Sequence, residues 1–167
     1  MSERTFWLMD ANVLLDYCSS DINVLALVGR HLGKVCVPSV VLAEVRELDA
    51  AKCELYGIHV MEPTLEQVQE AMCKRGGPLS LQDLVCFVMC RDHGWICVSN
   101  DRKLRAKCEH EDISVCWGLE LLIRLAEGRY LDITAALHTA EKIWRSNPYF
   151  INDKVMESFR RQLELIE

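Results

Sequence analysis

Five short apolar runs, separated by longer segments with helical periodicity, constrain the fold of this chain more than any other feature of its sequence. Each run is five or six residues long, and they lie at 6–10, 34–38, 58–62, 95–100 and 113–117. Helical patterns fill most of the intervals, at 22–33, 39–57, 64–76, 80–94 and 101–107. Strands this apolar must be covered on both faces. The alternation therefore predicts an α/β fold with a parallel sheet.

The last third of the chain has a different character. From residue 119 onward there is no strand-like run, and an amphipathic pattern predicts two or three helices, broken at 127–132 and 146–153. We therefore expect an α/β domain at 1–118 and a helical C-terminal extension at 119–167, packed on that domain. The apolar stripes of the extension need a partner surface, either the core or another chain. A stabilising cover and an interface are both open at this point.

Composition excludes several classes of protein. Hydrophobic residues make up 50% of the chain and charged residues 26%, the balance of an ordinary globular protein. No apolar run approaches the roughly 18 residues that a membrane helix needs. The opening residues 1–6, "MSERTF", lack the apolar stretch of a secretory signal. We expect a cytoplasmic protein without a membrane association.

Cysteine and charge are the two unusual quantities. The nine cysteines form no CxxC pair and lie within apolar runs, which predicts reduced thiols used as small core residues. Cys108 and His110 could form half of a metal site, but no second half is visible. The net charge of −6 argues against binding nucleic acid through bulk electrostatics. It leaves room for a local basic patch combined with a metal ion.

Two acidic residues directly follow apolar runs. Asp10 ends the first run, and Asp101 follows the fourth. A carboxylate at the end of a buried strand is costly unless something there requires it. In open parallel sheets the carboxyl ends of the strands form the crevice where ligands bind. The simpler alternative for Asp101 is that it, or Asn100, caps the helix that follows.

Two further acids lie in predicted helices. Glu44 stands beside the apolar stripe of the 39–57 helix, and its simpler alternative is a solvated helix face. Asp83 stands three residues after Ser80, the spacing of a capping box. The helix that follows is apolar nearly all round, so its first turn should lie near the sheet. A helix N-terminus there favours an anion.

The four acids together predict a metal site. Carboxylates brought this close repel one another and hold protons unless a cation is bound. Hard oxygen ligands suit Mg²⁺ or Mn²⁺. Such a site can activate water and clamp a phosphoryl group during an in-line displacement. We therefore predict metal-dependent phosphodiester hydrolysis, with metal-binding and catalytic roles for Asp10, Glu44, Asp83 and Asp101.

A basic stretch follows the last of these acids. The segment "RKLRAK" concentrates positive charge in an acidic chain and is predicted to contact RNA phosphates through Arg102, Lys103 and Arg105. Ordinary solvated helix charges are the alternative explanation.

The sequence resembles the PIN-domain ribonucleases over about residues 4 to 120, and in particular the VapC-type toxins of toxin–antitoxin pairs. The motifs "MDANVLLDY", "VPSVVLAEV", "LSLQDLVCFVMCRDHG" and "WICVSNDRKLR" occur in that family's order. The resemblance implies a three-layer α/β/α sandwich, Mg²⁺ or Mn²⁺ bound by the four acids, and single-stranded RNA as substrate. It adds Asn12 and Ser99 as supporting polar residues, with Ser99 standing where Thr is common. It also implies a homodimer and an inhibitory antitoxin partner.

Two other functions remain as alternatives. Phosphatases of the haloacid-dehalogenase type also begin with a strand ending in Asp, but they need a second acid two residues on, where this chain has Asn12. They also need a lysine before a late acidic pair, and "SNDRKLR" offers no such pair. A PIN-like protein that no longer cuts and serves as a binding module is the other alternative. The acidic net charge favours it, and the four retained acids count against it.

Overall fold

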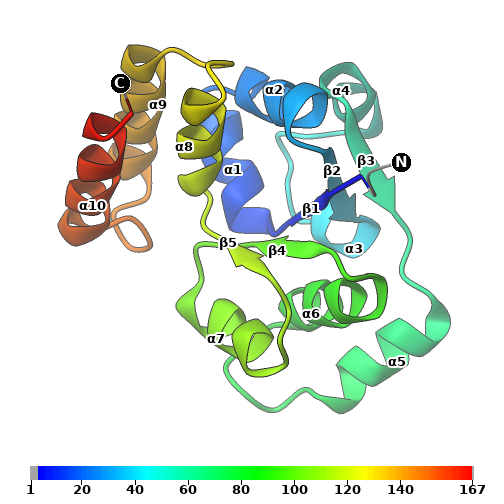
Figure 1. The fold of residues 1–167 in the computed structure, drawn as a ribbon. Coiled ribbons are helices and arrows are strands. Elements are labelled where there is room, and N and C mark those ends of the chain that lie inside the picture. The colour runs from blue at the N-terminus through cyan, green and yellow to red at the C-terminus, as the bar shows by residue number, and fades with distance from the viewer. Residues whose placement is uncertain (1–3, 167) are drawn as a thin grey trace.

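A five-stranded, all-parallel sheet lies between two layers of helices in the computed structural model, which describes residues 4–166 (Figure 1). The predicted α/β class, the parallel sheet and the three-layer sandwich are confirmed. The strand order is β3-β2-β1-β4-β5. The strands are β1 (Phe6–Met9), β2 (Lys34–Pro38), β3 (Ile58–Met61), β4 (Ile96–Val98) and β5 (Val115–Cys116). Expectations about residues 1–3 and 167, which include half of the "MSERTF" segment, lie outside the described residues.

The helices divide between the two faces of the sheet (Figure 1). One face carries α1 (Ala11–Ser19), α2 (Asn23–His31) and α8 (Glu120–Glu127). The other carries α6 (Leu81–His93) and α7 (Arg102–His110), with α5 (Leu65–Cys73) packed on α6. The short helices α3 (Ser39–Leu42) and α4 (Ala50–Tyr56) contact the β2–β3 side of the sheet.

The central strand shows why continuous apolar runs form this sheet. Trp7, Leu8 and Met9 of β1 are all buried, because helices cover both of its faces. Trp7 pairs with Val35 of β2 on one side and with Ile96 of β4 on the other. The two strands that flank β1 are therefore fixed in register at the edge where Asp10 follows.

The structure differs from the predicted helices in two places. The single helix expected at 39–57 is wrong, because α3 ends at Leu42 and α4 begins only at Ala50. The side chain of Asp49 caps the new start by accepting a 2.8 Å hydrogen bond from the Lys52 N–H. In addition, α1 was not predicted as a helix. It begins directly after Asp10, whose carboxylate caps it.

The extension consists of α8, α9 (Ile133–Ser146) and α10 (Asp153–Glu164), broken within the two predicted segments. Helix α9 packs against α1, and α10 packs against α8 and α9. The apolar stripe of α8 belongs to the same hydrophobic core as β1. Other apolar side chains of the extension stay exposed, notably Tyr149 and Leu165, at 85% each.

The cysteines mostly serve as core residues, as predicted. All nine are free; seven are buried, Cys18 is half-buried and Cys73 is exposed. Burial raises the pKa of Cys36 to about 12 and that of Cys86 well above its ordinary value. Between residues 4 and 166, no helix combines the length and the apolar character needed to cross a bilayer.

Candidate functional site

The strand order places a crevice at one edge of the sheet. After β1 the chain builds β2 and β3 on one side, then crosses to build β4 and β5 on the other. In open parallel sheets, ligands bind outside the carboxyl ends of the two strands between which the order reverses. Those strands are β1 and β4. Asp10 follows the first, and the segment Ser99–Asp101 follows the second.

Asp10 is a buried carboxylate at this switch point, with 3% of its surface exposed. One oxygen accepts a 2.9 Å hydrogen bond from the Val13 N–H, and the other accepts a hydrogen bond from the Ser99 hydroxyl. Burial raises the pKa of Asp10 to about 7. These two hydrogen bonds oppose the rise, while the nearby charges of Asp83 and Asp16 add to it. A pKa near neutrality means that both the protonated and the charged form of Asp10 are populated around pH 7.

Ser99 joins the two acids that follow β1 and β4. Its hydroxyl donates to Asp10 and accepts a 3.0 Å hydrogen bond from the Asp101 N–H. Its own N–H donates to the Cys116 carbonyl at 3.0 Å, which extends the β4–β5 pairing. Its carbonyl accepts a 3.0 Å hydrogen bond from the Arg105 guanidinium. Every polar group of Ser99 is thus used to hold this segment in one place.

Asp101 and Asp83 are both helix caps, so the simpler alternatives for them are confirmed. Asp101 accepts a 2.8 Å hydrogen bond from the Lys103 N–H at the start of α7. Asp83 and Ser80 form a reciprocal capping box at the start of α6, with bonds of 3.0 and 3.1 Å. Among the described residues, each cap uses one carboxylate oxygen. The second oxygen of each remains available to a ligand.

Glu44 and Asn12 lie differently from these acids. Glu44 is exposed in the turn after α3, and none of the hydrogen bonds or ion pairs within residues 4–166 involves its side chain. Asn12 is half-buried in the first turn of α1. The charge of Asp83 acts on Asp10, and Ser99 links Asp10 to the Asp101 N–H, whereas Glu44 lies on an exposed turn after α3.

The three predicted RNA contacts on α7 separate into two kinds. Arg102 and Lys103 are exposed. Arg105 is 5% exposed, and its guanidinium lies 3.4 Å from the centre of the Trp117 ring. Burial lowers the pKa of Arg105, while nearby acids, including Asp101, oppose the change. Arg105 therefore holds the Ser99 segment from the inside, whereas Arg102 and Lys103 face solvent.

Sequence reasoning missed Asp16, Asn100 and Asn147. Asp16 is 5% exposed, and each of its oxygens accepts a 2.9 Å hydrogen bond from an amide, one from Asn100 and one from Asn147. Burial raises the pKa of Asp16 to about 6, against the effect of the two amides. The available signal was a lone acid inside the apolar stretch "VLLDYC".

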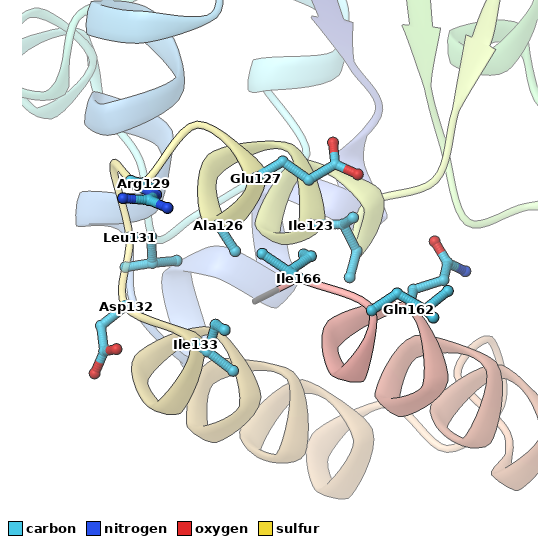
Figure 2. Close-up of a pocket in the computed structure, with 10 residues that line it drawn as sticks. Ile123, Ala126, Glu127, Arg129, Leu131, Asp132, Ile133, Gln162 and Ile166 are labelled. Carbon is cyan, nitrogen blue, oxygen red and sulfur yellow. The ribbon is translucent and has the colours of Figure 1, made fainter.

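A cavity of about 720 Å³ lies elsewhere, between α8, the α8–α9 loop and the end of α10. Figure 2 shows Ile123, Ile133 and Ile166 facing this space. None of the predicted acids lines it, so it is separate from the acidic site. A smaller cavity of about 240 Å³ lies between the end of α5, the loop before α6, and α7, and is lined by Lys74, Lys103 and Lys107; none of the predicted acids lines it either.

The described residues contain no preformed metal-binding group, and three comparisons with known proteins find no match. Within residues 4–166, no three His, Cys, Asp or Glu side chains form a group ready to hold a metal ion. No family model, curated protein or solved structure matches the chain. The site must therefore be interpreted from its own geometry.

Proposed function

We propose that this protein is a metal-dependent endoribonuclease that hydrolyses phosphodiester bonds of single-stranded RNA at the switch point of the sheet. One observation carries the proposal: a buried Asp10 at the carboxyl end of the central strand, bonded to Ser99 in the segment that also carries Asp101. Its described hydrogen-bond donors are neutral. A bound cation would restore the charge of a carboxylate whose pKa burial has raised to about 7.

The donor set fits Mg²⁺ or Mn²⁺. Asp10, Asp83 and Asp101 offer hard oxygen donors near the switch point, and Ser99 holds Asp10 in place. Mg²⁺ is usually bound through one or two carboxylates and keeps several waters, so it does not require three converging side chains. Asp10, together with Asp83 or Asp101, would hold the ion. Glu44 was predicted from its placement and from the family resemblance, and within residues 4–166 no hydrogen bond joins it to this set.

The chain's own residues would bind and orient the reactants. When bound, the metal ion supplies Lewis-acid polarisation of the phosphoryl oxygen and a more acidic water. The remaining oxygens of Asp83 and Asp101 can accept hydrogen bonds from the attacking water. As that water adds to phosphorus it would give a proton to one of these carboxylates, while the bond to the leaving oxygen breaks and that oxygen takes a proton from solvent. Because the Val13 N–H and the Ser99 hydroxyl fix the Asp10 carboxylate, its orientation need not change during the reaction.

The lysine-lined cavity supports a polyanionic substrate. Lys74 at the end of α5 and Lys103 and Lys107 of α7 line one concave surface, to which Leu84 of α6, the residue after Asp83, also contributes. Lys74 and Lys107 lie over the Phe87 ring, and none of the three lysines forms an ion pair among residues 4–166. Ammonium groups without a carboxylate partner repel each other, and a phosphate of the RNA backbone would relieve this repulsion. This surface and the exposed Arg102 provide the local basic patch that an acidic protein needs.

The test is cleavage of a labelled single-stranded RNA with Mg²⁺, with Mn²⁺ and with EDTA. Asp10→Asn and Asp101→Asn should abolish metal-dependent cleavage, because Asn keeps both helix caps but removes the charge. Asp49→Asn is the matched control, since Asp49 caps α4 in the same way away from the site. Glu44→Gln decides whether that acid contributes. Cleavage that persists in EDTA, or in Asp10→Asn, would overturn the proposal.

The proposal also covers the oligomeric state, the protein partner and the cellular location. Following the family resemblance, we propose a homodimer in the cytoplasm whose activity an antitoxin-like protein blocks. The exposed apolar side chains of the extension, including Tyr149 and Leu165, support a partner surface there. Light scattering of the purified protein tests the dimer. A monomer at all concentrations would contradict it.

A further inference from the structure

A buried polar network connects the C-terminal extension to the acidic site. Asp16 of α1 lies at its centre and accepts one hydrogen bond from Asn100 and one from Asn147, each 2.9 Å long. Asn147 ends α9 and stands 131 residues from Asp16 along the chain. The carboxylate therefore bridges the segment after β4 and the end of α9, within the extension.

Asn100 carries this connection into the site. It is the residue between Ser99 and Asp101, and it is 3% exposed. While its amide nitrogen donates to Asp16, its oxygen accepts a 2.9 Å hydrogen bond from the Gly118 N–H. A Cβ at Gly118 would come within 3.1 Å of both of these Asn100 atoms, so a side chain there would crowd the network. Both ends of the Asn100 amide are therefore held.

Simple structural stabilisation does not account well for this arrangement. The Asp16 carboxylate is buried, and within residues 4–166 its hydrogen-bond donors are neutral amides. A buried carboxylate without a cationic partner carries a large desolvation cost. Well-packed apolar residues would join the same elements with less cost. The two amides come from the site segment and from the extension, so holding one against the other is what this carboxylate achieves.

We propose that Asp16 and Asn147 are positioning residues that hold Ser99, Asn100 and Asp101 against Asp10, so that the C-terminal extension is a working part of the acidic site. The functional half of this inference rests on the proposed metal-dependent function. The structural half concerns only the metal-free protein. The two halves can therefore be tested separately.

The first experiment replaces Asn147 by alanine and measures amide hydrogen exchange in metal-free protein by NMR. The informative amides are those of Asp101, bonded to the Ser99 hydroxyl, and Gly118, bonded to the Asn100 side chain. We expect both to exchange about fivefold faster or more, the equivalent of one hydrogen bond. Asn152→Ala is the matched control, because Asn152 lies in the same extension and caps α10 through the Val155 N–H. It should leave both amides unchanged.

The second experiment exchanges the two groups in the double variant Asp16→Asn with Asn147→Asp. The amide oxygen introduced at position 16 can accept from Asn100, and its nitrogen can donate to the carboxylate introduced at position 147. The double variant should restore slow exchange at Asp101 and Gly118. It should also restore the Mn²⁺ affinity, measured by calorimetry, which we expect Asn147→Ala to lower about fivefold or more.

The outcomes separate the two proposals. Unchanged exchange in Asn147→Ala, equal acceleration in Asn152→Ala, or no rescue by the exchanged pair would overturn the positioning role. Faster exchange with unchanged Mn²⁺ affinity would also overturn it, since the network would then be stabilising only. If the unaltered protein binds no Mn²⁺ and cuts no RNA, the proposed function fails, while the exchange data still decide whether Asp16 and Asn147 hold the segment.

Discussion

Different kinds of side chain cover the two edges of the sheet, where the strands begin and where they end. At the amino edge, aromatic rings cover the strand starts: Phe6 stacks on Trp95 at 5.2 Å, and Trp95 stacks on His93 at 4.2 Å. Lys34 adds its ammonium group 5.3 Å from the centre of the Phe6 ring. At the carboxyl edge, the strands run into buried polar and charged side chains, namely Asp10, Asp16, Ser99, Asn100 and Arg105.

The difference shows what stability alone requires. Among residues 4–166, the amino edge closes with half-buried rings and partly exposed ion pairs such as Arg91–Glu70, at 2.6 Å, and no carboxylate is buried there. The same fold could have closed its other edge in that way. Instead the carboxyl edge keeps two carboxylates whose pKa values burial raises to about 7 and about 6. Among the described residues, the desolvation cost of buried carboxylates is found at the carboxyl edge and not at the amino edge, which points to a function at the carboxyl edge.

The largest expected effect is the loss of cleavage in Asp10→Asn. We expect a decrease of at least about 10³-fold in the rate of metal-dependent RNA cleavage, since several kcal/mol of transition-state stabilisation depend on the bound ion. Single-turnover assays at saturating Mn²⁺ measure it. Trp95→Ala, at the amino edge, should cleave normally. Comparable losses in both variants would remove the functional distinction between the edges.

The next effect is on stability as a function of pH. Because burial raises the folded-state pKa of Asp10 above its ordinary value, folding favours the protonated form. This preference contributes about 4 kcal/mol at most to the free energy of unfolding. The contribution is fully present below about pH 4 and is lost as the pH rises to about 7.

Urea unfolding in EDTA between pH 4.5 and 8 tests this prediction against Asp10→Asn. As the pH rises, Asp10→Asn should become more stable than the unaltered protein. When Mn²⁺ replaces EDTA, this difference in stability should be smaller. Parallel pH curves for the two proteins would show that Asp10 is solvated rather than buried. Asp16 and Arg105 are present in both proteins, so their contributions to the pH dependence largely cancel in the difference.

A smaller effect is expected for Ser99→Ala. The variant removes the hydroxyl that donates to Asp10 and accepts from the Asp101 N–H. Groups that orient a metal ligand typically contribute 10- to 100-fold to affinity, so Mn²⁺ binding should weaken by roughly that factor. Calorimetry measures it, and Ser99→Thr should restore most of the affinity. An unchanged affinity would mean that the bond to Asp10 does not help to orient a ligand.

The smallest effect is expected at the amino edge itself. Trp95→Ala removes a half-buried ring that stacks on both Phe6 and His93, and should lower the free energy of unfolding by about 1–2 kcal/mol. Denaturant titration measures this loss, and Mn²⁺ affinity should not change. A change in Mn²⁺ affinity would show that the two edges are coupled through β1 and β4.

Local chemistry explains which features the sequence predicted. The five strands and the caps at Ser80 and Asp101 follow from short patterns, and the structure has them where those patterns lie. The break after Leu42 was missed because the apolar stripe continues through it, with Val45 and Leu48 buried from a turn rather than a helix. The spacing of apolar residues indicates which side chains are buried, and it is the same here for a continuous helix and for a turn.

The site was predicted less completely for a different reason. Asp10 and Asp101 could be found because each follows a strand. Asp16 and Asn147 meet across 131 residues, and no local pattern relates an acid in one helix to an amide at the end of another. Arg105 looked like its exposed neighbours in sequence. Only the packing of Trp117 against it shows that this cation faces inward.

The rates at which the free cysteines react with a thiol reagent report how often different parts of the structure open. Cys73 is exposed and should react at once with a thiol reagent, whereas the seven buried thiols can react only when their surroundings open. They are spread over the sheet and the helices on both of its faces, from Cys36 in β2 to Cys108 in α7. Mass spectrometry of each labelled cysteine against time would therefore rank the layers by how often they open, without any substitution in the chain.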